Sequence, residues 1–197
     1  IMPLGAFKAA LMGTAGVSTA TGDVVLLYDT DHSGVSEVDI TSKITSTYGE
    51  YIFGFYNINP ATDDATFSFQ ANVAGESGFN ETVAGTAFRA SITDQGSASL
   101  SYLTGSDPGQ APAAILLTGG IGNGSDESCA GILHLFNPSS TTYVKHYYSR
   151  FNSYETSNYS QDQLTAGYFN VTGAIDEITF KMDSGDFDGT IKMWGVK

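Results

Sequence analysis

The sequence predicts an all-β fold, a jelly-roll-like β-sandwich. Short apolar or alternating runs follow one another from residue 23 onward, and turn residues separate them. Charged residues make up only 15% of the chain, so Ser, Thr, Asn, Gln and Gly must supply most of the polar surface. These residues disfavour helices, because Ser, Thr and Asn compete for backbone hydrogen bonds and Gly is costly in a helix. The length of 197 residues suits one sandwich, and 41% hydrophobic residues can fill its core.

The first 22 residues differ from the rest of the chain. Residues 4–12 have apolar side chains at helical spacing, and the Gly, Ser and Thr residues that follow are typical of a linker. We therefore divide the chain into an N-terminal arm or anchor, residues 1–22, and a sandwich domain, residues 23–197. A packed terminus that covers one sheet edge is the alternative interpretation of residues 1–22.

Alternation and apolar runs locate the strands of the sandwich domain. We expect strands at residues 24–28, 50–58, 65–73, 82–92, 98–103, 113–118, 131–137, 142–151, 168–171, 175–182 and 190–196. In the second of these, Tyr51, Phe53 and Phe55 share one face, and Ile58 is expected on the other. Pro, Gly, Asn and Asp mark the expected breaks at residues 59–64, 107–109, 122–124, 137–139 and 188–189.

Charge and cysteine content exclude several classes of partner. The net charge is −13 and the pI is about 4.2, which argues against nucleic acid and anionic membrane surfaces, because both are negatively charged. No apolar run is long enough to predict a membrane span. Cys129 is the only cysteine, so no disulfide can form within the chain, and its neighbours predict a buried, unreactive thiol.

Two acidic segments are candidate cation sites. Asp29-Thr30-Asp31-His32-Ser33-Gly34 places oxygen ligands at alternate positions before a Gly, like the first half of a calcium loop. The twelfth position is Ile40, however, where a bidentate carboxylate is needed, so a strand-ending turn is the simpler interpretation. Asp183-Ser184-Gly185-Asp186-Phe187-Asp188-Gly189 lies between two expected strands and is interpreted as a hairpin loop. The sequence therefore assigns no metal site.

No pattern in the sequence singles out a catalytic site. His32, His134 and His146 lack metal-ligand spacing, and the glycine-rich run 119–124 lacks the Lys-Ser/Thr ending of a phosphate loop. Any two of the 21 acidic residues could converge as a glycosidase pair, but nothing selects one pair. We therefore expect no catalytic residue, no cofactor and no enzymatic activity. The tyrosine-rich segment 143–159 could stack on sugar rings, although a core or interface strand explains it equally well.

Three blocks taken together resemble a family of proteins encoded among the structural genes of tailed bacteriophages, many of them marine. The resemblance spans residues 23–197. The first block is Ile44-Thr45-Ser46-Thr47-Tyr48 with Tyr51-Ile52-Phe53 and Ile58-Asn59-Pro60-Ala61-Thr62-Asp63. The second is Ile121-Gly122-Asn123 with Gly131-Ile132-Leu133-His134-Leu135-Phe136-Asn137-Pro138 and the Ser/Thr run after it. The third is Ala174-Ile175-Asp176-Glu177-Ile178-Thr179-Phe180 with Ser184-Gly185 and Gly189-Thr190-Ile191-Lys192-Met193-Trp194-Gly195-Val196-Lys197. The family usually has Tyr at the position of Trp194.

The resemblance implies a non-enzymatic virion structural protein with a β-sandwich domain, located in a head decoration, a fibre or another tail component. It implies contacts with other virion proteins and a homo-oligomer, and it carries over no site residue. The lone cysteine fits assembly in a reducing bacterial cytoplasm. The alternative function is a receptor- or glycan-binding module, calcium-dependent or not, at a fibre tip or secreted.

Overall fold

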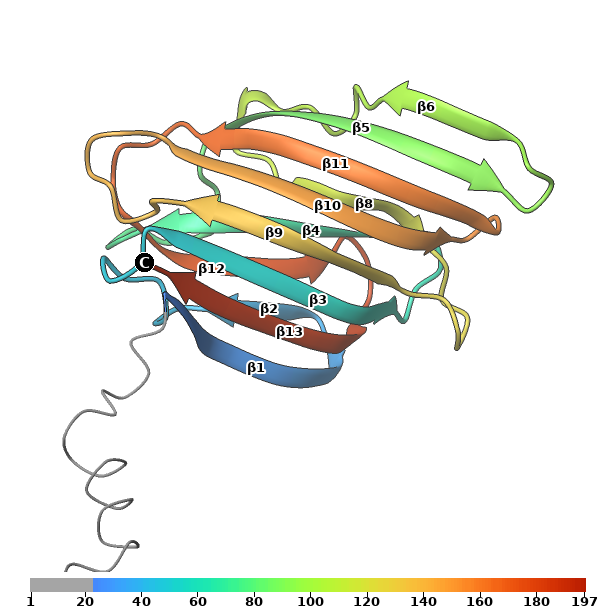
Figure 1. Cartoon of the computed structure of the whole chain (residues 1–197), viewed down its shortest axis with the longest axis horizontal. Helices are drawn as coiled ribbons and strands as arrows, with labels where there is room; N and C mark the ends of the chain where they lie inside the picture. Colours follow the sequence, from blue (N-terminus) through green and yellow to red (C-terminus); the bar gives the residue numbers. More distant parts are fainter. Residues whose placement is uncertain (1–22) are drawn as a thin grey trace, which may run out of the picture.

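The computed structural model describes residues 23–197, which form two layers of antiparallel β-sheet (Figure 1). The predicted all-β sandwich is confirmed. The expected arm, with its helix at residues 4–12, lies outside the described residues. Within residues 23–197, no helix is long and apolar enough to cross a membrane. The strands are β1 (Val24–Val35), β2 (Glu37–Ile40), β3 (Glu50–Pro60), β4 (Ala65–Val73), β5 (Val83–Thr93), β6 (Ala98–Tyr102), β7 (Gly109–Ala111), β8 (Ile115–Ile121), β9 (Cys129–Phe136), β10 (Lys145–Glu155), β11 (Tyr159–Phe169), β12 (Ile175–Met182) and β13 (Phe187–Val196).

The two layers are unequal in width. The larger sheet has the order β1-β13-β3-β9-β10-β11-β5, and β6 and β7 both pair with the outer edge of β5. The smaller sheet has the order β2-β12-β4-β8. One residue pair, Glu155 opposite Ile121, joins β10 to β8 and links the layers. The chain crosses between layers repeatedly, for example from β3 to β4, as expected of a jelly-roll-like sandwich rather than a meander.

Phenylalanine rings from the two layers meet in the core. Phe55 of β3 contacts Phe67 of β4 and Phe180 of β12 edge to face, with ring centroids 5.5 and 5.0 Å apart. Phe151 of β10 packs on Phe55 at 5.2 Å. All four rings are buried. Aromatic pairs of this geometry add to the large apolar area that each ring removes from water, so this cluster holds the layers together.

The faces predicted for the second strand are mostly confirmed. Tyr51, Phe53 and Phe55 are buried on the inner face of β3. The prediction for Ile58 is wrong, because this side chain is also buried. The pairing of β3 with β9 shifts between Phe55 and Ile58, and Asn57 has a φ of 51°. The extra residue of this bulge reverses the alternation and turns Ile58 inward.

Several predicted strand boundaries are wrong. β1 continues through residues 29–34, which were expected to form a turn, and β8 includes Gly119 and Gly120. The expected break at residues 188–189 is an irregularity inside β13. β11 begins at Tyr159 rather than at residue 168. Its first part was missed because the inward residues there are polar, so apolar and polar side chains do not alternate in the sequence. β2 and β7 are too short to leave a pattern in the sequence.

The acidic segment before β13 is not a hairpin. β12 pairs with β2 and β4, whereas β13 pairs with β1 and β3. The connection at residues 183–186 therefore carries the chain from the smaller layer to the larger one, and the hairpin interpretation is wrong.

Replacing Phe55 tests the role of the aromatic cluster. We expect Phe55→Ala to lower the free energy of unfolding by about 3–5 kcal/mol, because the change leaves a cavity between the layers. Urea denaturation followed by circular dichroism measures the loss. Tyr143→Ala is the control, since Tyr143 is 70% exposed and its replacement should change stability by less than about 0.5 kcal/mol. Equal effects of the two changes would contradict the assigned role.

Candidate functional site

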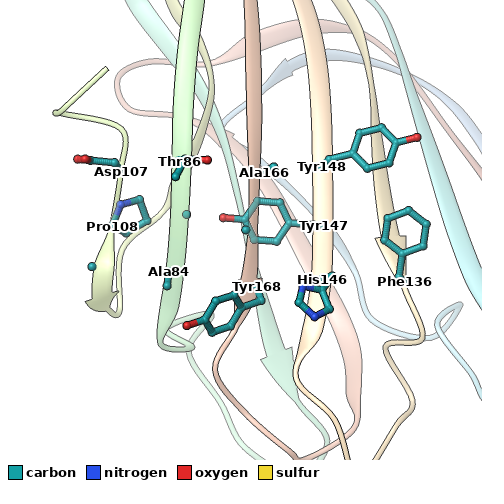
Figure 2. A pocket seen from close by; sticks show the side chains of 13 residues that line it. Ala84, Thr86, Asp107, Pro108, Phe136, His146, Tyr147, Tyr148, Ala166 and Tyr168 are labelled. Atoms are coloured by element: carbon teal, nitrogen blue, oxygen red, sulfur yellow. The ribbon is translucent and has the colours of Figure 1, made fainter. Parts of the chain in front are cut away.

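A groove of about 660 Å³ lies on the outer face of the larger sheet (Figure 2). Small residues form its floor, because Gly167 of β11 pairs with Gly85 of β5, and Ala166 and Ala84 lie beside them. Aromatic side chains of β9 and β10 stand on one side, and the segment before β7 stands on the other. We call this feature the aromatic groove; it is lined by Ala84, Gly85, Thr86, Asp107, Pro108, Gly109, Phe136, His146, Tyr147, Tyr148, Ala166, Gly167 and Tyr168.

Stacked rings fix the aromatic side of the groove. Tyr148 of β10 lies opposite His134 of β9, and their rings stack at 4.5 Å. Phe136 packs against Tyr148 at 5.6 Å. His134 is held in turn by Glu50 of β3, whose Oε1 lies 2.6 Å from His134 Nδ1. The Tyr148 ring is therefore held in place by its neighbours while it stays 46% exposed.

Polar groups surround the same groove. The Tyr168 hydroxyl accepts a hydrogen bond of 3.0 Å from Gln110 Nε2, and the His146 ring lies 5.8 Å from the Tyr168 ring. Across the groove, the Tyr102 hydroxyl donates to Asp107 Oδ2 at 2.9 Å, and this bond raises the pKa of Tyr102. An occupant would thus meet aromatic surfaces, a phenol, an imidazole and a carboxylate.

The glycines in the floor accommodate a tyrosine on the inner face of the sheet. A Cβ atom at Gly85 or Gly167 would lie 2.7 or 2.6 Å from the Tyr147 hydroxyl oxygen. Tyr147 is buried, its hydroxyl has no hydrogen-bond partner, and burial raises its pKa. Any larger residue at these two positions would displace Tyr147. The packing of this buried tyrosine therefore requires glycines in the floor of the groove.

The structure divides the tyrosine-rich segment 143–159 between two faces. Residues of β10 alternate, so Tyr148 and Tyr154 point outward and Tyr147 points inward. Among the tyrosines of this segment, only Tyr148 presents an exposed ring in the aromatic groove, and the exposed His146 lines the same groove. Tyr168 and Asp107 belong to other strands and connections, and no sequence pattern links them to Tyr148. His134 and Phe136 are two residues apart on β9 and therefore share a face.

The two acidic segments lie side by side where β1 pairs with the start of β13, and residues 183–186 of the second segment form the connection before β13. Asp29 pairs with Lys192 at 3.0 Å, and Asp31 accepts a hydrogen bond from the Thr190 hydroxyl at 2.6 Å. The Gly34 backbone N–H donates to Asp188 at 2.7 Å. An extended strand cannot curl alternate oxygens around one ion, so β1 lacks the calcium-loop geometry. Among the described residues, no group of three metal-ligating side chains is present.

The remaining candidate residues are scattered. Cys129 is buried as predicted, and burial raises the pKa of its thiol. His32 lies near Tyr28, with a hydroxyl-to-Nε2 distance of 3.1 Å, and burial lowers the pKa of His32. His134 and His146 lie on β9 and β10, which are neighbouring strands of the larger sheet, and each packs beside a tyrosine ring.

A second exposed feature lies at the far edge of the larger sheet. Its apolar side chains are between 44 and 74% exposed, and we call them the apolar edge face: Phe88, Ile92, Leu100 and Tyr102. They share the outer face, because Phe88 pairs with Tyr102 and Ile92 with Ala98. The opposite face carries polar residues such as Ser91 and Ser99, whose hydroxyls lie 2.8 Å apart. Within the described residues β6 pairs only with β5, so its second edge is free.

Comparison with known proteins leaves this chain without an assigned relative: no protein-family model and no curated protein matches it.

Proposed function

We propose that this protein is a non-enzymatic virion structural protein of a bacteriophage, acting through multimeric contacts of its larger sheet. The apolar edge face carries the proposal. Exposed apolar patches of this kind mark protein contacts, and an unpaired strand edge invites the addition of another strand. The resemblance of the three sequence blocks to phage structural proteins supports the virion location.

The partner of the apolar edge face is a second copy of the same chain. The net charge of −13 makes two copies repel each other over most of their surface. Residues 95–106, which include β6, contain no charged side chain. Antiparallel pairing of two β6 strands about a two-fold axis would place Leu100 near its symmetry mate, as an isologous contact requires.

A charge at Leu100 tests this contact. We expect the native chain to self-associate and Leu100→Lys to be monomeric, because the introduced ammonium groups repel and cannot be buried without cost. Light scattering after size-exclusion chromatography measures the mass. Ile132→Lys is the matched control, since Ile132 is 46% exposed on the same outer face but away from β6. A native chain that stays monomeric at high concentration would refute the contact.

The copy number in purified particles tests the virion role itself. We expect quantitative mass spectrometry to detect the chain in purified particles and to give the ratio of its copies to those of the major capsid protein. A ratio of about one, or a simple fraction of one, indicates a head decoration, because capsid symmetry fixes such ratios. A much smaller ratio indicates a tail or fibre component. Absence of the chain from particles would contradict the proposal.

The aromatic groove favours a second candidate function, the binding of a receptor glycan. An exposed aromatic ring suits the apolar face of a sugar, and the phenol, imidazole and carboxylate around it can bond to sugar hydroxyls. The two functions are compatible if the protein lies at the tip of a fibre. The volume of about 660 Å³ is within the range of small-molecule sites.

Tyrosine substitutions test the glycan candidate. We expect neutral sugars such as glucose, galactose or N-acetylglucosamine to bind the native chain in saturation-transfer NMR. Tyr148→Ala should weaken binding about tenfold, the equivalent of roughly 1.4 kcal/mol of lost stacking. Tyr154→Ala is the matched control, because Tyr154 lies on the same strand and face but outside the groove. Equal losses in both variants would place the sugar elsewhere.

A further inference from the structure

A second cavity, of about 430 Å³, lies between the layers where the smaller sheet ends. β5 and β11 of the larger sheet form one wall, β8 forms the other, and the connection after β6 closes one end. Hydroxyl-bearing residues line much of it, including Thr104, Ser106 and Thr118. This cavity is separate from the aromatic groove, which lies on the outer face of the sheet.

Arg89 enters this cavity without an acidic counterpart. Its Nη1 donates to Gln161 Oε1 at 2.9 Å, and no carboxylate of the described residues lies within salt-bridge distance of it. Arg150, by contrast, makes two hydrogen bonds to Asp162. A guanidinium offers five N–H donors, so most of those of Arg89 remain available.

Glycine at position 119 gives the Arg89 guanidinium its room. A Cβ atom at Gly119 would clash with Arg89 Nη1 and with Gln161 Oε1. The glycine pair in β8, which does not belong to a phosphate loop, thus allows the Arg89–Gln161 pair to fit between the layers.

A buried acceptor without a partner lies beside Arg89. Gln163, opposite Arg89 in the β5–β11 pairing, lines the same cavity and is 2% exposed. Its Nε2 donates to the Leu116 carbonyl at 3.1 Å, but its Oε1 has no hydrogen-bond partner. A buried, unpaired acceptor costs free energy, and a hydroxyl donor in the cavity would recover it once the Gln163 amide turns toward the cavity. Arg89 therefore has free donors, and Gln163 a free acceptor, beside the same cavity.

We propose that this cavity binds a saccharide ring that carries one negative charge, a carboxylate or a sulfate ester. Arg89 forms a forked, charge-assisted pair with the anionic group, and a ring hydroxyl donates to Gln163 Oε1. The volume accommodates a single ring. The overall negative charge disfavours polyanions and so favours a ligand with a single charge. This site does not depend on the aromatic groove or on the virion role.

Titration of the full chain with four compounds tests the proposal: glucuronate, glucose 6-sulfate, glucose and inorganic sulfate. We expect at least one acidic sugar to bind about tenfold or more tightly than glucose and than inorganic sulfate, because only the sugar acid satisfies both Arg89 and Gln163. Binding of glucuronate alone assigns a carboxylate, and binding of glucose 6-sulfate alone assigns a sulfate ester.

Arginine variants locate the site. Arg89→Gln should abolish binding of the acidic sugar, and Arg150→Gln, the matched control on the outer face, should leave it unchanged. Arg89→Lys keeps the charge but loses the two parallel N–H donors of the guanidinium. We expect this variant to fold and to bind the acidic sugar about tenfold more weakly. The proposal would be overturned if neither acidic sugar bound, or if glucose or inorganic sulfate bound as tightly as the acidic sugar. Equal losses of binding in the Arg89 and Arg150 variants would also overturn it.

Discussion

The contact between phenylalanine rings of the two layers is the interaction on which the rest of the structure depends. Phe55, Phe67 and Phe180 come from three strands and meet only if each strand keeps its register. A slip by one residue would turn a ring into solvent and an outward residue into the core. Tyr148 and His134 occupy outward positions of strands whose inward residues pack in this core. The geometry of the aromatic groove therefore depends on the strand register that the core packing sets.

The unequal width of the layers explains both proposed contact regions. The smaller sheet ends at β8, whereas the larger sheet continues through β11, β5 and β6. Opposite β8, at the end of the smaller sheet, polar residues such as Arg89, Gln161 and Gln163 take the inward positions of the larger sheet. The outer face of the same strands carries the exposed apolar side chains. One architectural fact thus produces a polar cavity inside and an apolar surface outside.

Prediction from the sequence succeeds where the alternation is regular and fails where it breaks. The inward faces of Phe67, Phe69 and Leu133 follow from a period of two. Ile58 was assigned to the wrong face because a bulge changes the period, and most of β11 was missed because its buried residues are glutamines and a threonine. The candidate site was predicted only in part, because its tyrosines, histidine and carboxylate come together through the pairing of β10, β11 and β5.

The sequence by itself determined the all-β class, the inward aromatic residues and the buried Cys129, because alternation and turn chemistry act between neighbours along the chain. Only the tertiary structure decided which strands pair and which layer each joins. It made β1 pair with β13, so that Val24 lies opposite Val196, and it placed Gly119 against Arg89. Such contacts join residues far apart in the chain, and their selection depends on how both layers pack at once.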